Sequence, residues 1–144
     1  MTDTQHRLLA AIVAEPGEWT AAYHAELIAE DPAAVRDAVY RLAEHGYVAP
    51  RAYRLHGHAR AKLAAGRQPG ELTGWAMWRA DAWRTSHRLI RELESGPLSR
   101  EKRVLSGAEK KVMRVLHDIG IVSLPDCLWP TDEGIALVRE RRAA

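Results

Sequence analysis

The basic residues in the last third of the chain have the types and spacing to do chemistry. Lys110, Lys111 and Arg114 fall on one side of a helix, because residues three and four apart share a helical face. Lysine and arginine neutralise nucleic-acid phosphates, and affinity built in this way falls steeply with salt. Three more cations come shortly before them: Arg100, Lys102 and Arg103. The cluster predicts a surface for double-stranded DNA.

Two other groups are candidates for the same chemistry. Arg51, Arg54 and Arg60 form a second basic group in the middle of the chain. An earlier helix carries Arg36, Tyr40 and Arg41 on its outward side, but Asp37 and Glu44 on that side would repel phosphate. We therefore expect this helix to be a poor DNA surface, so that a protein-binding or architectural role suits it at least as well.

The charge is uneven along the chain, although the 144 residues sum to only +2. Residues 1–48 hold 3 Lys and Arg against 8 Asp and Glu, a net −5, and residues 49–103 hold 12 against 5, a net +7. From residue 104 onward, 6 cations balance 6 anions. A basic middle indicates a surface for a polyanion, and a solvated arginine-rich helix face is the competing interpretation.

Several classes of protein are disfavoured by the sequence. Its apolar runs fall short of the ~18 residues that cross a bilayer, and residues 1–16 do not follow the pattern of a signal peptide, so we expect a cytoplasmic protein. Cys127 is the single cysteine, which excludes an intramolecular disulfide and favours a buried side chain. His56 and His58 lack further metal ligands at suitable spacing. We expect no metal, no cofactor and no enzymatic activity.

The first half of the chain predicts three helices. Apolar residues spaced over 8–13 indicate the first, which ends at Pro16, and residues 19–30 form the second. Asp31 is typical of a residue that caps a third helix, Pro32 suits its first position, and Gly46 ends it. Residues 47–48 and 53–55 then favour two short strands of a hairpin that turns at Pro50.

The second half predicts a linker and a long helix. Glycine and proline at 66–70 indicate a break, so we assign 1–66 as one module, 67–73 as the linker, and 74–144 as a long helix with a second module. The long helix covers residues 74–93 and needs a partner surface, which is either the chain's own modules or a second subunit. The residues of that expected interface are Trp75, Trp78, Trp83, Leu89 and Leu93.

A weak internal repeat relates the two halves. AVYRLAEHGYV, residues 38–48, is similar to VMRVLHDIGIV, residues 112–122, when Gly46 is aligned with Gly120. The following segments RAYRLHGHARAKLAA and DCLWPTDEGIALVRE also correspond. The repeat favours two tandem modules, and one amino-terminal module with a helical appendage is the alternative.

The segment DPAAVRDAVYRLAEHGYV resembles the recognition helix of winged helix-turn-helix proteins of the MarR, GntR and PadR types. YRLHGHARAKLAAG and LWPTDEGIALV are similar to the segment that leaves the wing in those proteins. The first copy departs from the pattern, because its wing is very short and His56-Gly57-His58 replaces the usual threonine turn. The resemblance implies a mainly α fold with short β wings, in tandem, joined by the long tryptophan-rich helix.

The resemblance also implies a function. It favours a small transcriptional regulator that binds DNA as a homodimer, with a helix in the major groove and basic residues on phosphates. The alternative is a winged-helix module that grips another protein without touching DNA, since winged-helix subunits of chromosome-organising complexes resemble this arrangement of paired modules. The alanine- and arginine-rich composition suits a high-GC bacterium or its phage.

Overall fold

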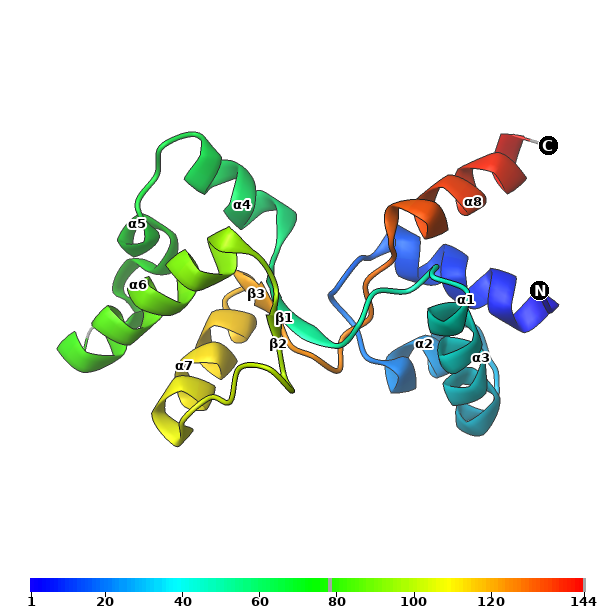
Figure 1. The fold of residues 1–144 in the computed structure, drawn as a ribbon, viewed down its shortest axis with the longest axis horizontal. Coiled ribbons are helices and arrows are strands. Elements are labelled where there is room, and N and C mark those ends of the chain that lie inside the picture. The colour runs from blue at the N-terminus through cyan, green and yellow to red at the C-terminus, as the bar shows by residue number, and fades with distance from the viewer. Residues whose placement is uncertain (78, 144) are drawn as a thin grey trace. The chain divides into compact units, whose positions relative to one another are not determined.

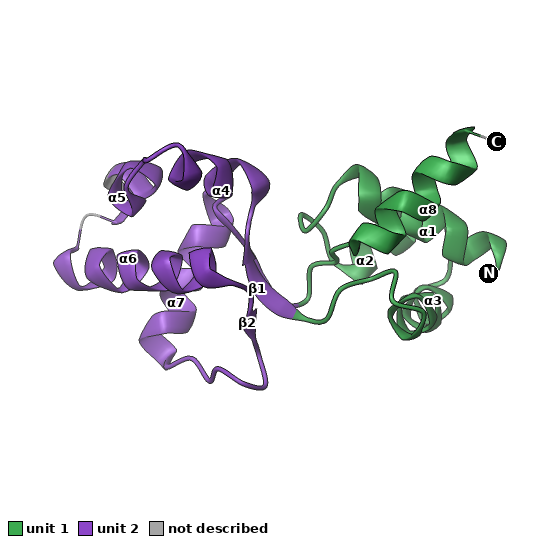
Figure 2. Ribbon diagram, turned by 45° about the horizontal axis from the view of Figure 1, so that its top comes forward, with its two compact units in different colours: residues 1–51, 126–144 green, residues 52–125 purple. Residues whose placement is uncertain are grey.

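The computed structural model describes residues 1–77 and 79–143, apart from the side chain of Trp75. The protein is mainly helical, with a small antiparallel sheet of three strands in the order β2-β1-β3 (Figure 1). It divides into two compact units: residues 1–51 with 126–144, called unit 1, and residues 52–125, called unit 2 (Figure 2). In the described part of the chain, none of the helices combines the length and the apolar character that crossing a membrane requires.

Unit 1 is built from α1 (Asp3–Ala14), α2 (Ala21–Leu27), α3 (Pro32–Glu44) and α8 (Asp132–Ala143). The local signals for α3 are confirmed: the Asp31 carboxylate accepts hydrogen bonds from the amides of Ala33 and Ala34 at 3.2 and 3.3 Å, and Gly46 follows the helix with φ +78°. Helix α1 packs against α3 and α8. Its apolar stripe, Leu8, Leu9 and Ile12, is fully buried.

Unit 2 contains α4 (Gly57–Ala64), α5 (Pro69–Thr73), a 3-10 turn η1 (Gly74–Met77), α6 (Ala80–Ser95) and α7 (Gly107–Asp118). Two expectations differ from the structure here. The long helix begins at Ala80 and not at Gly74, which has φ +54° and so cannot continue an α-helix. The expected linker holds α5, whose Pro69 and Thr73 are buried and which packs against α6.

The predicted hairpin of residues 47–48 with 53–55 is wrong. Strand β1 (Ala52–Leu55) pairs instead with β2 (Leu98–Ser99) and with β3 (Val122–Ser123), both antiparallel. As the central strand it pairs along both of its edges, whereas a two-stranded hairpin would leave one edge of backbone groups open. Val48, on the other side of Pro50, forms its bridge with Pro130 in unit 1.

The two halves of the chain exchange their closing segments. Strand β1 and helix α4 follow α3 in the sequence, yet they complete unit 2. The extended residues 127–130 and helix α8 follow α7, yet they complete unit 1. We call residues 52–64 and 126–143 the exchanged segments. Each compact unit therefore has boundaries that differ from the division at residues 67–73 expected from the sequence, and unit 1 combines two segments that are far apart in the chain.

The internal repeat reappears in the pairing of the backbone. The bridge of Val48 to Pro130 in unit 1 corresponds to the pair Val122 and Leu55 in unit 2. Likewise, Thr20 pairs with Cys127 as Ser99 pairs with Ala52. The glycines that end the two central helices also match, since Gly46 has φ +78° and Gly120 has φ +81°. Both units thus combine a helix that ends at a glycine with short antiparallel backbone pairing, which forms strands in unit 2 and isolated bridges in unit 1.

Candidate nucleic-acid interface

Helix α7 presents its basic residues to solvent because its other side is held in the core. Val112, Met113 and Leu116 are buried against the core that α6 also lines. Since 3.6 residues complete a turn, Lys110, Lys111 and Arg114 lie away from that stripe, and all three are exposed. This is the arrangement that the sequence predicts for a helix facing a polyanion.

The start of α7 is fixed by a capping box. The Ser106 hydroxyl accepts a hydrogen bond from the Glu109 amide at 3.2 Å, and the Glu109 carboxylate accepts one from the Ser106 amide at 2.9 Å. These two bonds satisfy amides that a helix start otherwise leaves without partners. Glu109 immediately precedes Lys110, so the cap also defines where the basic face begins.

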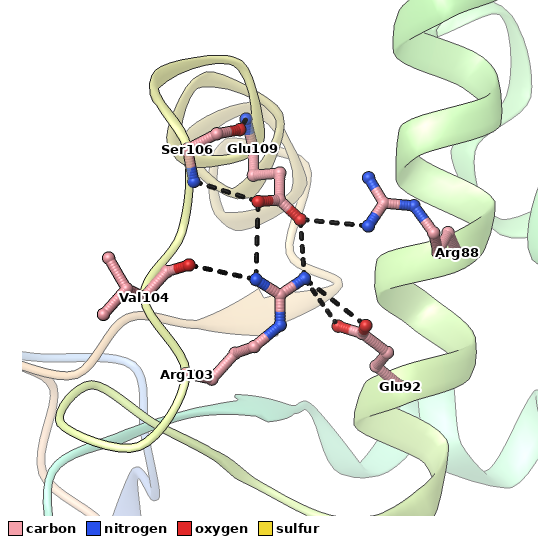
Figure 3. A network of polar contacts seen from close by, with 6 residues as sticks. All are labelled: Arg88, Glu92, Arg103, Val104, Ser106 and Glu109. Atoms are coloured by element: carbon pink, nitrogen blue, oxygen red, sulfur yellow. Dashed lines mark hydrogen bonds and ion pairs between the residues drawn. The ribbon is translucent and has the colours of Figure 1, made fainter.

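A network of charged side chains ties α7 to α6 and to the turn before α7 (Figure 3). The Arg103 guanidinium donates to Glu109 at 2.7 Å, to Glu92 of α6 at 3.3 Å and to the Val104 carbonyl at 3.0 Å. Arg88 of α6 lies 3.1 Å from the same Glu109 carboxylate. The hydrogen bond from Arg103, followed by that from the Ser106 amide, lowers the pKa of Glu109 to about 2.

The network changes the role of one predicted DNA contact. The same carboxylates raise the pKa of Arg103, with Glu109 contributing most, and its half-buried guanidinium is occupied by them. Arg103 therefore positions α7 and does not project toward a ligand. Arg100 and Lys102, on the turn between β2 and α7, are exposed. The cations that face solvent on and beside α7 are Arg100, Lys102, Lys110, Lys111 and Arg114.

The second basic group is not one surface of one unit. Arg51 is exposed in unit 1, whereas Arg54 and Arg60 belong to unit 2. Arg54 lies half-buried in the central strand β1, where burial, and then the nearby Arg60, lowers the pKa of its guanidinium. Of these three arginines, Arg60 on α4 is the one that is exposed in unit 2.

Helix α3 provides an internal comparison for α7. When Gly46 is aligned with Gly120, the outward residues Arg36, Asp37 and Tyr40 fall at the positions of Lys110, Lys111 and Arg114. The three α3 residues are exposed, Tyr40 to 64%. Arg41, the remaining predicted contact on α3, lies 3.6 Å from Glu44. The same helical face is therefore strongly cationic on α7 and close to neutral on α3.

The charge of each unit follows the same division. Unit 1 holds 7 Lys and Arg against 12 Asp and Glu, a net −5, and unit 2 holds 14 against 7, a net +7. The exchanged segments leave this contrast intact. Long-range attraction of a polyanion therefore favours unit 2 and opposes unit 1.

The expected partner interface on the tryptophan-rich helix is partly wrong. Leu89 and Leu93 are fully buried in the core of unit 2, so they are covered by the chain itself. Trp83 is 40% exposed and packs on His87, with ring centroids 3.8 Å apart. Trp78 and the side chain of Trp75 lie outside the described residues.

The sequence interpretation missed the residues that hold α7 in place. The role of Glu109 in the helix cap can be predicted from the sequence, because Ser106 and Glu109 have the spacing of a capping box. Arg88 and Glu92 carry no comparable signal, since their roles depend on α6 packing beside the turn that contains Arg103.

Comparison with models of protein families, with curated proteins and with solved structures found no match to this chain.

Proposed function

We propose that the protein binds double-stranded DNA through unit 2, as a small transcriptional regulator of winged-helix type. In this proposal α7 is the recognition helix, and β1, β2 and β3 are the short strands of the wing sheet. The order of α6, β2, α7 and β3, with β1 supplied by the other half of the chain, supports this assignment. Unit 1 has the same framework without the basic face.

The observation that carries the proposal is the contrast between α7 and α3. Two helices of one repeat have equivalent outward positions, and one of them presents Lys110, Lys111 and Arg114 where the other presents Arg36, Asp37 and Tyr40. A shared framework accounts for the similar cores, but it does not account for three cations on one exposed face. Phosphate and guanine contacts are the chemistry that such a face supports.

The mechanism is occupancy of a DNA site. Helix α7 enters the major groove, where Arg114 and the two lysines reach base edges or phosphates. Arg100 and Lys102, on the preceding turn, contact the flanking backbone, and Arg103 holds this turn and α7 in a fixed orientation. The bound protein then blocks or recruits polymerase.

The test is duplex DNA binding measured by fluorescence anisotropy across a salt series. The variant Lys110→Ala/Lys111→Ala/Arg114→Ala is compared with Lys62→Ala/Arg67→Ala/Arg139→Ala, which removes the same charge at three exposed positions outside the proposed interface. We expect the first variant to bind weakly and to flatten the slope of log K against log salt by up to about 3, while the control stays close to wild type.

Two results would contradict the proposal. One is the absence of binding by wild type at 50 mM salt, which is a permissive condition for phosphate contacts. The other is an equal loss in the two variants, because that would assign the attraction to total charge and not to α7.

A second function is favoured by the exposed aromatic surface of unit 1. Trp19 stacks on Tyr23 with centroids 4.1 Å apart, and Leu27, four residues further on, is 54% exposed. These three side chains form an apolar surface on a unit of net negative charge. Together the two properties support a protein-interaction module without DNA contact. In that case wild type should show no salt-dependent DNA binding, and Trp19→Ala/Leu27→Ala should weaken binding of the partner protein.

Homodimer formation stays part of the regulator proposal. The exposed Trp83 is the described residue that still supports it among those expected at the interface. Sedimentation equilibrium of wild type and of Trp83→Ala checks this point, with a lower dimer fraction expected for the variant.

A further inference from the structure

Unit 1 contains a cavity of about 260 Å³ between α1 and α8. Its apolar wall is formed by Leu9 and Ala10 of α1 and by Leu137 and Val138 of α8. Leu9 and Val138 also belong to the core of the unit, so the packing of that core holds the apolar wall in place. A pocket with an apolar wall and few polar groups is the usual form of a small-molecule site.

The polar groups around this cavity carry mainly positive charge. Arg141 and Arg142, on the last turn of α8, line it together with His6 and Arg7 of α1, and Asp3 is the only acidic residue among its lining residues. The positive rim is unusual for its surroundings, because unit 1 as a whole has a net charge of −5.

The two arginines of α8 are available for a ligand. Arg7 is engaged, since it pairs with Glu30 at 3.1 Å and donates to the Ile28 carbonyl. Within the described residues, Arg141 and Arg142 form no ion pair with a carboxylate, and both are exposed. Burial, and then the positive charges of Arg141 and of the amino terminus, lowers the pKa of His6, while Asp3 acts in the opposite direction.

We propose that this cavity binds a small organic carboxylate. The apolar body of the ligand lies against Leu9, Ala10, Leu137 and Val138, and its carboxylate accepts hydrogen bonds from Arg141 and Arg142, for which a guanidinium is well suited. The volume favours a ligand below drug size, such as a single ring or a short branched chain that carries one carboxylate. The site is independent of the DNA-binding proposal, because it lies in unit 1 and that interface lies in unit 2.

Fluorine NMR tests the proposal with the full-length protein. The probes are 4-fluorobenzoate, 4-fluorophenylacetate and 4-fluorocinnamate, each a single ring with one carboxylate, and the neutral 4-fluorobenzamide reports on apolar binding without a carboxylate. We expect line broadening and saturable binding for at least one carboxylate, and a dissociation constant about tenfold or more weaker for the amide.

Two variants locate the binding. Arg141→Ala/Arg142→Ala removes the charge from exposed positions, and we expect about tenfold weaker carboxylate binding. Ala10→Leu fills the cavity and keeps every charge, so it should weaken the amide and the carboxylate together. The control Arg36→Ala/Arg139→Ala removes the same charge elsewhere in unit 1 and should bind as wild type does.

Three outcomes would overturn the proposal: no binding of any of the three carboxylates, equal binding of 4-fluorobenzamide, or unchanged carboxylate affinity in Arg141→Ala/Arg142→Ala. Thermal unfolding of each variant is measured in parallel. If Ala10→Leu does not fold, the arginine variant alone decides the question. DNA binding by the same samples is read separately, so the two proposals can fail independently.

Discussion

Arg103 and Glu109 lie 2.7 Å apart, and this contact joins the turn before α7 to the first turn of the helix itself. Glu109 is 7% exposed and also accepts from the Ser106 amide, so its charge is satisfied on both oxygens. Removing one member of such a network leaves the remaining charged side chains without an oppositely charged hydrogen-bond partner.

Glu109→Gln should destabilise the protein by about 1.5–3 kcal/mol near pH 7, because it removes charge-assisted hydrogen bonds. The folded pKa of about 2 lies below the ordinary value of 4.5, so this contribution is complete above about pH 4.5 and is lost as the pH falls toward 2. Urea unfolding at pH 7 and pH 3 measures it, and the difference between wild type and variant should shrink at pH 3.

Glu94→Gln is the matched control on α6. Glu94 pairs with Arg91 at 3.1 Å, but both side chains are more than a third exposed, so its loss should cost less than about 1 kcal/mol. An equally large effect of the two substitutions would show that the Glu109 network adds nothing beyond an ordinary surface pair.

His24 should make the protein less stable in mild acid. Its imidazole is fully buried, and neither ring nitrogen has a hydrogen-bond partner in the described part of the chain. Burial lowers the pKa of His24 from 6.5, with Glu15 acting in the opposite direction. Unfolding therefore takes up a proton below about pH 6.5, and stability falls as the pH drops further, by at most about 1.4 kcal/mol per unit for this one group.

His24→Leu isolates that contribution from the other histidines. Urea midpoints are measured at pH 8, 6.5 and 5. As the pH falls, the free energy of unfolding of the variant should rise relative to that of wild type. A constant difference between the two proteins over this range would mean that the pKa of His24 is the same in the folded and the unfolded chain.

Gly17 should tolerate alanine less well than Gly46, although their φ angles are +74° and +78°. A Cβ atom at Gly46 meets open space, so Gly46→Ala should cost only the 1–2 kcal/mol of a left-handed backbone. A Cβ atom at Gly17 would collide with the indole of Trp129, which arrives with the exchanged segment 126–143. We expect an additional loss of about 1–3 kcal/mol for Gly17→Ala.

A double-mutant cycle assigns this additional loss. In a Trp129→Ala background the collision disappears, so Gly17→Ala should then cost about as much as Gly46→Ala. Chemical denaturation of the four proteins of the cycle gives the coupling energy. A coupling energy near zero would show that Trp129 does not pack on Gly17.

Fragments cut in chain order should not fold separately. A fragment of residues 1–66 contains α1 to α3 but lacks α8, and a fragment of residues 67–144 lacks β1, the central strand of the sheet. Circular dichroism should show weak helicity for each fragment and a gain on mixing, with a 1:1 complex in size-exclusion chromatography. Two independently folded fragments would contradict the exchange of segments.

The elements that depend on local chemistry could be predicted from the sequence. The carboxylate of Asp31, the ring of Pro32 and the glycine at 46 define the two ends of α3 without help from the rest of the chain. The solvent-facing position of Lys110 and its neighbours follows in the same way from the apolar period of α7. Both signals act within a few residues, so periodicity and capping rules are sufficient.

The pairing of the strands could not be predicted in this way. Strands β2 and β3 have two residues each, and such short segments can pair equally well with several partners. The pattern also showed that Leu89 and Leu93 share an apolar face, but an apolar period does not identify what covers the face. The chain's own core covers it here, which is why an interface was wrongly expected at these leucines.

The exchanged segments have a consequence for the order in which the protein is made. During synthesis α1, α2 and α3 emerge before residues 127–130 and α8, which complete unit 1. Unit 2 in turn holds β1 without partners until β2 and β3 have been translated. Neither unit is therefore complete while the ribosome is still in the middle of the chain. The large sequence separation of these pairs favours slow, late folding, with exposed strand edges that a chaperone would need to shield.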